Sequence, residues 1–186
     1  MLKKISLASA LLGFVALPAM AETPTFNFVQ VGYVSDLSGS SDYDGFEIKG
    51  NLEISDTLYM NAGFTKTNAS VSFGDLDIDV ITLGLGYKTN ISAVSTLFAE
   101  ADYLVVDNDF NGFGSDNGYQ VGFGIRSMML GSVELKAAGY YRDINSSDTF
   151  LQVGAAYDFT EAAGVYLDIE SDFDDTGFGI GLRFSF

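Results

Sequence analysis

Apolar side chains recur at every second position through most of the chain. In the stretch GFEIKGNLEIS one face carries Phe46, Ile48, Leu52 and Ile54, and the other carries Glu47, Lys49, Asn51 and Glu53. A repeat of two residues is typical of a β-strand, because successive side chains of a strand point to opposite faces. After residue 21, no window of ten residues shows a helical stripe. The pattern therefore predicts an all-β protein.

The same alternation divides the chain into ten predicted strands, at about residues 25–35, 45–55, 57–67, 78–88, 94–106, 118–128, 133–143, 149–159, 164–171 and 176–186. Short turns between them alternate with longer polar connections, such as 68–77. That layout is typical of a closed, antiparallel, up-and-down transmembrane β-barrel, and strands of about 9–11 residues suit a tilted crossing of a bilayer. We predict ten strands, with eight as the alternative.

A soluble β-sandwich also alternates, but the distribution of side chains disfavours it. A sandwich would keep one polar, solvated face, whereas here that face is rich in glycine and the apolar face continues through all ten strands. Aromatic side chains on the apolar face gather near both strand ends: Tyr33, Phe46, Tyr103, Tyr119, Tyr141 and Phe178 toward the long connections, and Tyr87, Tyr157, Phe159, Phe184 and Phe186 toward the short turns. Two such girdles are typical of a membrane barrel.

The N-terminal residues and the overall composition narrow the class further. Lys3 and Lys4 precede an apolar run from about Ile5 to Leu17 and a small-residue ending at Ala21, which predicts a cleaved signal peptide over 1–21 and a barrel domain over 22–186. Without the two leader lysines the chain has 7 basic and 25 acidic side chains, so nucleic acid is not an expected partner.

The absence of histidine and cysteine bears on catalysis. The sequence contains no His and no Cys, so it lacks the commonest general base, a thiolate nucleophile and a disulfide framework. No pair of carboxylates stands at a spacing that indicates glycoside chemistry. We therefore expect no enzymatic activity and no cofactor.

Four stretches carry a resemblance to a known family: FNFVQVGYV, DGFEIKGNLEI, NGYQVGFGIRS and GLRFSF. They resemble the small outer-membrane β-barrel proteins of Gram-negative bacteria, often described as porin-like, over essentially the whole chain after the leader. The resemblance implies a location in the cell outer membrane, contact with its lipid and lipopolysaccharide, and biogenesis through periplasmic chaperones and the barrel-assembly machinery. It also implies that the last strand is the assembly signal, carried by Phe178, Ile180, Leu182, Phe184 and Phe186.

The face opposite the apolar one should line the lumen, and it carries most of the basic residues. They are Lys49, Lys88, Arg126, Lys136, Arg142 and Arg183, together with eight acids: Glu47, Glu53, Glu100, Asp102, Glu134, Asp158, Asp168 and Glu170. Charges in a narrow barrel are costly unless they are paired or hydrated. We expect Arg126 to bridge Glu100 and Glu134, and Lys136 to lie near Asp158. With Lys49 and Arg183, these residues form the predicted lumen charge network.

Glycines also fall on the inward face, as G-x-G pairs such as Gly84 with Gly86 and Gly122 with Gly124. No helix follows them, so they do not form a dinucleotide-binding loop. Glycine in a strand marks curvature or the close approach of another group. We expect these glycines to make room for four inward rings: Tyr59, Phe98, Tyr140 and Tyr166.

The long connections are strongly acidic. The stretch DNDFNGFGSDNG begins like a calcium loop, with Asp107, Asp109 and Asn111 at alternate positions and Asp116 further on, but Gly118 stands where the bidentate Glu belongs. The loops therefore indicate either a site for divalent cations or a solvated rim that attracts cations. Together these features predict a structural or surface-interaction role with a lumen largely filled by ion pairs, and, as the alternative, a small cation-preferring channel.

Overall fold

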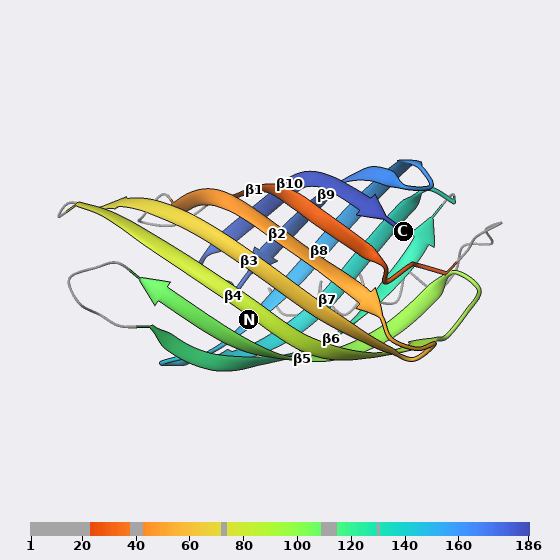
Figure 1. Cartoon of the computed structure of the whole chain (residues 1–186), viewed down its shortest axis with the longest axis horizontal. Helices are drawn as coiled ribbons and strands as arrows, with labels where there is room; N and C mark the ends of the chain where they lie inside the picture. Colours follow the sequence, from red (N-terminus) through yellow and green to blue (C-terminus); the bar gives the residue numbers. More distant parts are fainter. Residues whose placement is uncertain (1–22, 38–42, 72–73, 109–114, 130) are drawn as a thin grey trace, which may run out of the picture.

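The computed structural model describes residues 23–37, 43–71, 74–108, 115–129 and 131–186. They form ten strands: β1 Phe28–Asp36, β2 Tyr43–Glu53, β3 Leu58–Val71, β4 Gly74–Asn90, β5 Ser95–Asn108, β6 Asp116–Met129, β7 Val133–Asp143, β8 Ser147–Thr160, β9 Ala163–Ser171 and β10 Thr176–Ser185. Every strand pairs antiparallel with its chain neighbours, and β10 pairs with β1 (Figure 1). The predicted closed barrel of ten strands is confirmed, and the alternative of eight is wrong.

The seam between the first and last strands closes the hydrogen-bonded ladder. Its register runs from Phe28 opposite Ser185 to Asp36 opposite Gly177 without a break. A closed ladder leaves no strand edge, and in hydrocarbon each unpaired backbone group would cost several kcal/mol. No helix in the described part of the chain is long and apolar enough to cross a membrane.

The outer surface is apolar, with aromatic side chains near both ends. Leucine and valine side chains of the middle belt stand exposed, including Leu83, Leu85 and Val121. The end of the barrel with the Asp-rich connections is here called the loop end. Toward it, the ring centres of Tyr119 and Tyr141 lie 6.2 Å apart. Tyr87 and Tyr157 stand exposed toward the opposite end, here called the turn end. This arrangement matches the two girdles expected from the sequence.

One predicted loop is a continuation of the sheet. Residues 68–77 were expected to form a polar connection, but β3 and β4 stay paired from Leu58 opposite Tyr87 to Val71 opposite Gly74. Lys66 lies opposite Asp79 in this extension, and their side chains form an ion pair of 2.9 Å. Cross-strand pairs of opposite charge stabilise a ladder, which explains how a polar sequence continues as a strand. The hairpin projects past its neighbours at the loop end (Figure 1).

The apolar belt leads to a stability prediction. Leu83 is 56% exposed and lies midway along β4 between Asp79 and Tyr87, so its Arg variant would place a charge near the bilayer midplane. Leu83→Arg should lower the free energy of unfolding by about 2–4 kcal/mol in lipid. Leu37→Arg is the matched control, because Leu37 is 60% exposed beyond the end of β1 and its change should stay within about 0.5 kcal/mol. Denaturant titration in vesicles measures both, and equal losses would contradict the assigned belt.

Candidate functional site

The turn-end half of the lumen is built around one glutamate and two arginines. Arg126 of β6 donates from Nε and Nη2 to the two carboxylate oxygens of Glu134 on β7, at 2.6 and 2.7 Å. Arg183 of β10 donates from Nη1 to Glu134 Oε2 at 3.0 Å. Arg126 is 3% exposed, Glu134 is 5% exposed and Arg183 is 1% exposed. Two guanidinium groups therefore share one buried carboxylate across the barrel.

Aromatic rings complete the surroundings of these guanidinium groups. The Cζ atom of Arg126 lies 4.2 Å from the ring centre of Phe26, and that of Arg183 lies 4.3 Å from the ring centre of Phe28. Among the described residues, Arg126 Nη1 and Arg183 Nε have no hydrogen-bond acceptor. Burying these two N–H groups without an acceptor costs free energy. Cation–π attraction to the rings is worth roughly 2 kcal/mol when the cation is desolvated, and it offsets part of that cost.

The residues before β1 turn into the lumen. The backbone N–H of Phe26 donates to Glu53 Oε1 at 2.9 Å, and the N–H of Glu53 donates to Asn27 Oδ1 at 2.8 Å. Arg183 Nη2 also donates to the carbonyl of Thr25 at 3.4 Å. These bonds hold the Phe26 side chain inside the barrel, where it is 1% exposed.

A layer of inward rings meets Phe26. The ring centre of Phe26 lies 4.6 Å from that of Tyr59 and 6.2 Å from that of Phe98. Tyr140 and Phe150 stack at 5.0 Å and belong to the same buried cluster. We call this layer, together with the charged triad, the plug; its residues are Phe26, Phe28, Tyr59, Phe98, Arg126, Glu134, Tyr140, Phe150 and Arg183. Side chains from opposite walls of the barrel thus meet across the lumen.

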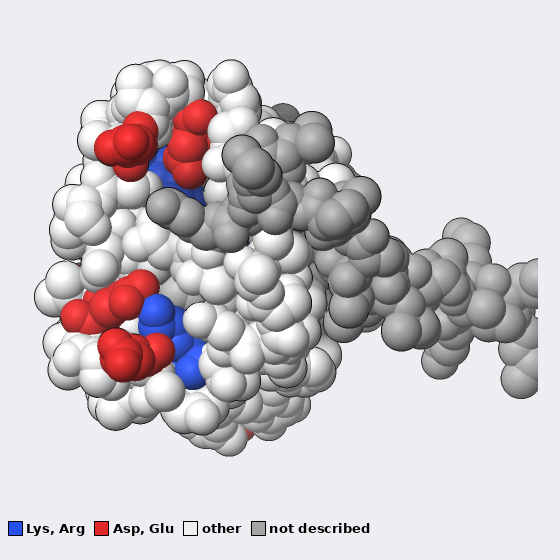
Figure 2. All heavy atoms as spheres, turned by 90° about the vertical axis from the view of Figure 1, so that its right-hand side faces the viewer, with Lys and Arg blue, Asp and Glu red and all other residues white. Residues whose placement is uncertain are grey.

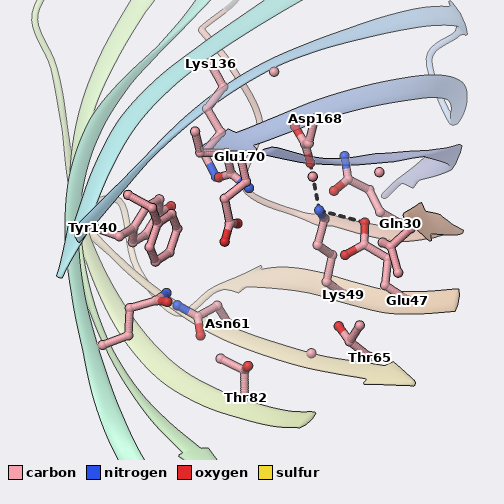
Figure 3. A pocket seen from close by; sticks show the side chains of 18 of the residues that line it. Gln30, Glu47, Lys49, Asn61, Thr65, Thr82, Lys136, Tyr140, Asp168 and Glu170 are labelled. Carbon is pink, nitrogen blue, oxygen red and sulfur yellow. Dashed lines mark hydrogen bonds and ion pairs between the residues drawn. The ribbon is translucent and has the colours of Figure 1, made fainter. Parts of the chain in front are cut away.

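Above the plug the lumen holds a cavity of about 640 Å³. Its described lining runs from Asp148 and Asp175 at the loop end down to the rings of Phe26 and Tyr59. Lys49 lies in its wall, and its Nζ contacts Glu47 Oε1 at 2.8 Å and Asp168 Oδ2 at 2.7 Å (Figure 3). The described ion pairs therefore leave part of the lumen open, and the expectation of a lumen largely filled by ion pairs is not confirmed.

Acidic side chains outnumber basic ones in this cavity. The described lining contains ten carboxylates and five basic side chains, the five being Lys49, Arg126, Lys136, Arg142 and Arg183. The turn end carries charges of both signs: seen from that end, basic side chains lie next to acidic ones in two places (Figure 2). One ion pair lies there between Lys88 Nζ and Glu53 Oε1, at 2.8 Å, and neither residue lines the cavity.

The predicted charge network is present in part. The contact between Arg126 and Glu134 forms, but the predicted contact between Arg126 and Glu100 does not. Glu100 instead accepts hydrogen bonds from the hydroxyl groups of Tyr59 and Tyr140, both at 2.8 Å. The strand register explains the difference, because Glu100 lies opposite Gly122, two inward positions from Arg126.

The predicted proximity of Lys136 and Asp158 is also wrong. Lys136 lies opposite Gly154, and its Nζ is 5.5 Å from the ring centre of Phe98 and 5.6 Å from that of Tyr140. Asp158 lies further toward the turn end, with its Oδ1 without a hydrogen-bond partner among the described residues. In the register of β7 and β8, Asp158 stands four residues along β8 from Gly154, the residue opposite Lys136.

Inward glycines make room for the rings, as the sequence predicted. A Cβ atom on Gly86 would overlap the ring of Tyr59, and one on Gly122 would overlap the ring of Tyr140. The rings of Phe26 and Phe28 were not predicted as lumen residues. A signal was available, because both stand at positions of the polar face, opposite in parity to Val29 and Val31.

The loop end carries no convergent metal site in the part of the chain that the structure describes. Of the predicted cation loop, Asp107 is the last residue but one of β5, and Asp116 begins β6, where it accepts a hydrogen bond from Asn145 Nδ2 at 2.7 Å. Asp109 and Asn111 lie outside the described residues. The predicted cation loop thus stays a prediction.

The turn between β9 and β10 is ordered by one carboxylate. Asp172 Oδ1 accepts hydrogen bonds from the backbone N–H groups of Asp175, at 2.7 Å, and Asp174, at 3.0 Å. These donors hold the pKa of the Asp172 carboxyl below its ordinary value. Phe173 in the same turn has a positive φ of 81° and is 73% exposed.

Comparison with solved structures shows which known fold the chain shares. The chain superposes with a TM-score of 0.56 on an outer membrane channel from Pseudomonas putida F1, at 12% identity, covering 92% of this chain and all of that one. It superposes with a TM-score of 0.51 on the KdgM porin in complex with disordered oligogalacturonate, at 11% identity, covering 86% of this chain and 99% of that one. The chain therefore has the fold of the outer-membrane porin-type β-barrels. No family model and no curated protein matches the sequence.

The buried triad leads to a stability prediction. Glu134→Ala would leave two guanidinium groups facing each other without their carboxylate, and it should destabilise the barrel by about 3–5 kcal/mol. Glu170→Ala is the control, because Glu170 is 40% exposed at its side chain and lies 3.5 Å from Arg142, so its loss should cost below about 1 kcal/mol. Unfolding in urea measures both variants. A loss at position 134 no larger than that at 170 would contradict a dry triad.

The Asp172 turn leads to a pH prediction. Because the pKa of Asp172 is lowered by folding, its stabilisation is present above the unfolded pKa, near 4, and disappears as the pH falls through the lowered value. Amide protection of Asp174 and Asp175, corrected for intrinsic exchange, should therefore fall in acid. Asp172→Asn keeps an acceptor oxygen that does not titrate, so its protection should stay constant. The same decline in both proteins would exclude this carboxylate as the cause.

Proposed function

We propose that the protein is an integral outer-membrane barrel whose lumen is closed at the turn end, with a structural or surface-interaction role. The single observation that carries this proposal is the plug. Its rings and its Arg126–Glu134–Arg183 triad reach across the lumen from opposite walls, with all three charged side chains buried. A lumen blocked by dry, mutually bonded side chains offers ions no hydrated path.

Residence in the outer membrane is supported by the outer surface. The exposed apolar belt between two aromatic girdles fits the hydrocarbon and headgroup layers of a bilayer. Lys66, Asp77 and Asp79 lie together at the loop-end margin of this belt, where the phosphates of lipopolysaccharide would stand. In this proposal the barrel-assembly machinery and periplasmic chaperones deliver the chain, and β10 is the strand that the machinery recognises.

A surface role is supported by the loop end, which in this proposal faces the outside. In the described lining of the cavity, which includes Asp148, Asp172 and Asp175 at this end, carboxylates outnumber basic side chains, and they produce a negative potential that attracts cations. The β9–β10 turn holds Phe173 exposed in an uncommon backbone conformation. Strained, exposed residues cluster at contact sites more often than elsewhere. Divalent cations held between the loops and lipopolysaccharide belong to the same proposal.

A small cation-preferring channel is the second candidate, and the cavity is the observation that favours it. A space of about 640 Å³ with twice as many carboxylates as basic groups in its described lining would select cations if it opened at both ends. The similar structures are described as a porin and a channel. Their low identity to this chain limits the comparison to the fold.

Conductance in planar bilayers separates the two candidates. The purified full-length chain, shown to be folded by its altered gel migration before boiling, should give no conducting steps in potassium chloride. Steps with a reversal potential that favours potassium would instead support the channel. A known porin inserted under the same conditions serves as the positive control, so that silence can be interpreted.

A further inference from the structure

One element of the plug differs from all the others in how it is attached. Tyr59, Phe98 and Tyr140 project from β3, β5 and β7, where ladder hydrogen bonds fix their backbones on both sides. Phe26 precedes β1, which begins at Phe28, and lies outside the strand ladder. The hydrogen bonds of its segment with the wall run through the side chains of Glu53, Asn27 and Arg183, and through one backbone bond in which the Phe186 N–H donates to the Asn27 carbonyl at 3.2 Å. Phe26 is therefore the plug ring that can leave without opening the sheet.

Phe26 is also the ring that joins the two sides of the lumen. On one side it contacts Tyr59 and Phe98, at ring-centre distances of 4.6 and 6.2 Å. The Cζ atom of Arg126, on the strand next to that of Phe98, lies 4.2 Å from the same ring centre. On the other side the segment of Phe26 is bonded to Glu53 on β2 and Arg183 on β10. The Lys88 ammonium lies 5.1 Å from the same ring, and its ion pair with Glu53 belongs to the turn end. The cavity and the turn end thus meet at Phe26.

We propose that the segment Thr23–Asn27 is a removable stopper, and that the barrel without the Phe26 ring is a cation-conducting pore. This inference rests on the proposed function, in which the lumen is closed. Removing the ring leaves a gap bordered by Tyr59, Phe98 and Arg126, each still held on its own strand. The cavity above would then connect with the turn end past the pair of Lys88 and Glu53.

The charges along this path predict what it conducts. At the gap, the basic groups of Lys88, Arg126 and Arg183 stand against the carboxylates of Glu53, Glu134 and Asp158, so neither sign prevails. The cavity above contributes the excess of carboxylates. Small hydrated cations such as potassium should therefore pass more readily than chloride.

The experiment compares Phe26→Ala with the unchanged chain in planar bilayers. Phe26→Ala should change silence into discrete steps whose reversal potential favours potassium over chloride. Phe26→Leu, which keeps part of the volume, should give smaller or rarer steps. Phe123→Ala removes the same side chain from the middle of the outer surface of β6 and should stay silent. Altered gel migration before boiling verifies that each variant is folded.

A cysteine confirms the route of the current. The chain has no native cysteine, and Thr82 lies in the cavity wall (Figure 3). In the double variant Phe26→Ala with Thr82→Cys, a positively charged thiol reagent should reduce the step size, and it should leave Phe26→Ala alone unchanged. Steps that the reagent does not alter would mean that current passes outside the lumen, which overturns the inference.

The two proposals fail in different ways. A folded Phe26→Ala variant that stays silent overturns the stopper and leaves the closed barrel intact. An unchanged chain that conducts in steps as large as those of Phe26→Ala overturns the closed barrel itself. If Phe26→Ala does not fold, Phe26→Leu decides: silence from folded Phe26→Leu protein counts against the stopper, and steps count for it.

Discussion

The structure depends on one constraint: in hydrocarbon, every backbone N–H and C=O group must find its partner within the chain. The pairing of β1 with β10 meets this requirement by removing the last free edge. Once the ladder is closed, side chains have only two destinations. Along each strand, every second side chain faces lipid, where apolar residues such as Leu83 and Val121 are favoured. The side chains between them face a narrow lumen.

The narrow lumen in turn determines what polar residues can do there. A buried charge is costly unless its partners are close, and the structure contains two solutions. Glu134 is shared by two guanidinium groups that also face aromatic rings, whereas Glu100 is held by two tyrosine hydroxyl groups. Both arrangements join opposite walls of the barrel. The same groups that solve the electrostatic problem therefore also obstruct the lumen, and the Phe26 ring occupies the space that remains between them.

The sequence predicted the fold well because the repeat of two residues indicates directly on which face of the sheet each side chain lies. Strand number, closure, the aromatic girdles and the glycines beneath Tyr59 and Tyr140 all follow from parity and spacing. The pairing of Arg126 with Glu134 was predictable because a short turn fixes the register of β6 and β7. Contacts across the lumen were not predictable in this way.

The contacts that escaped prediction are long-range. Glu100 meets Tyr59 and Tyr140 through the curvature of the barrel, which no pairwise register reveals. Phe26 stands outside the ladder, so its parity indicates only which face it favours and not that its segment turns inward. The extension of β3 and β4 was missed because polar residues such as Lys66 and Asp79 are paired there across the strands instead of forming a loop.

The position of the Phe26 ring is the most direct test of this account, and nuclear Overhauser effects in detergent micelles report it. The ring centre of Phe26 lies 4.6 Å from that of Tyr59 and 6.2 Å from that of Phe98. The ring protons of Phe26 should therefore show cross-peaks to those of both rings in the folded barrel. Selective labelling of phenylalanine and tyrosine isolates these signals. A Phe26 ring that shows cross-peaks only to solvent or detergent, in a barrel whose strand pairing is intact, would contradict a lumen closed by this residue.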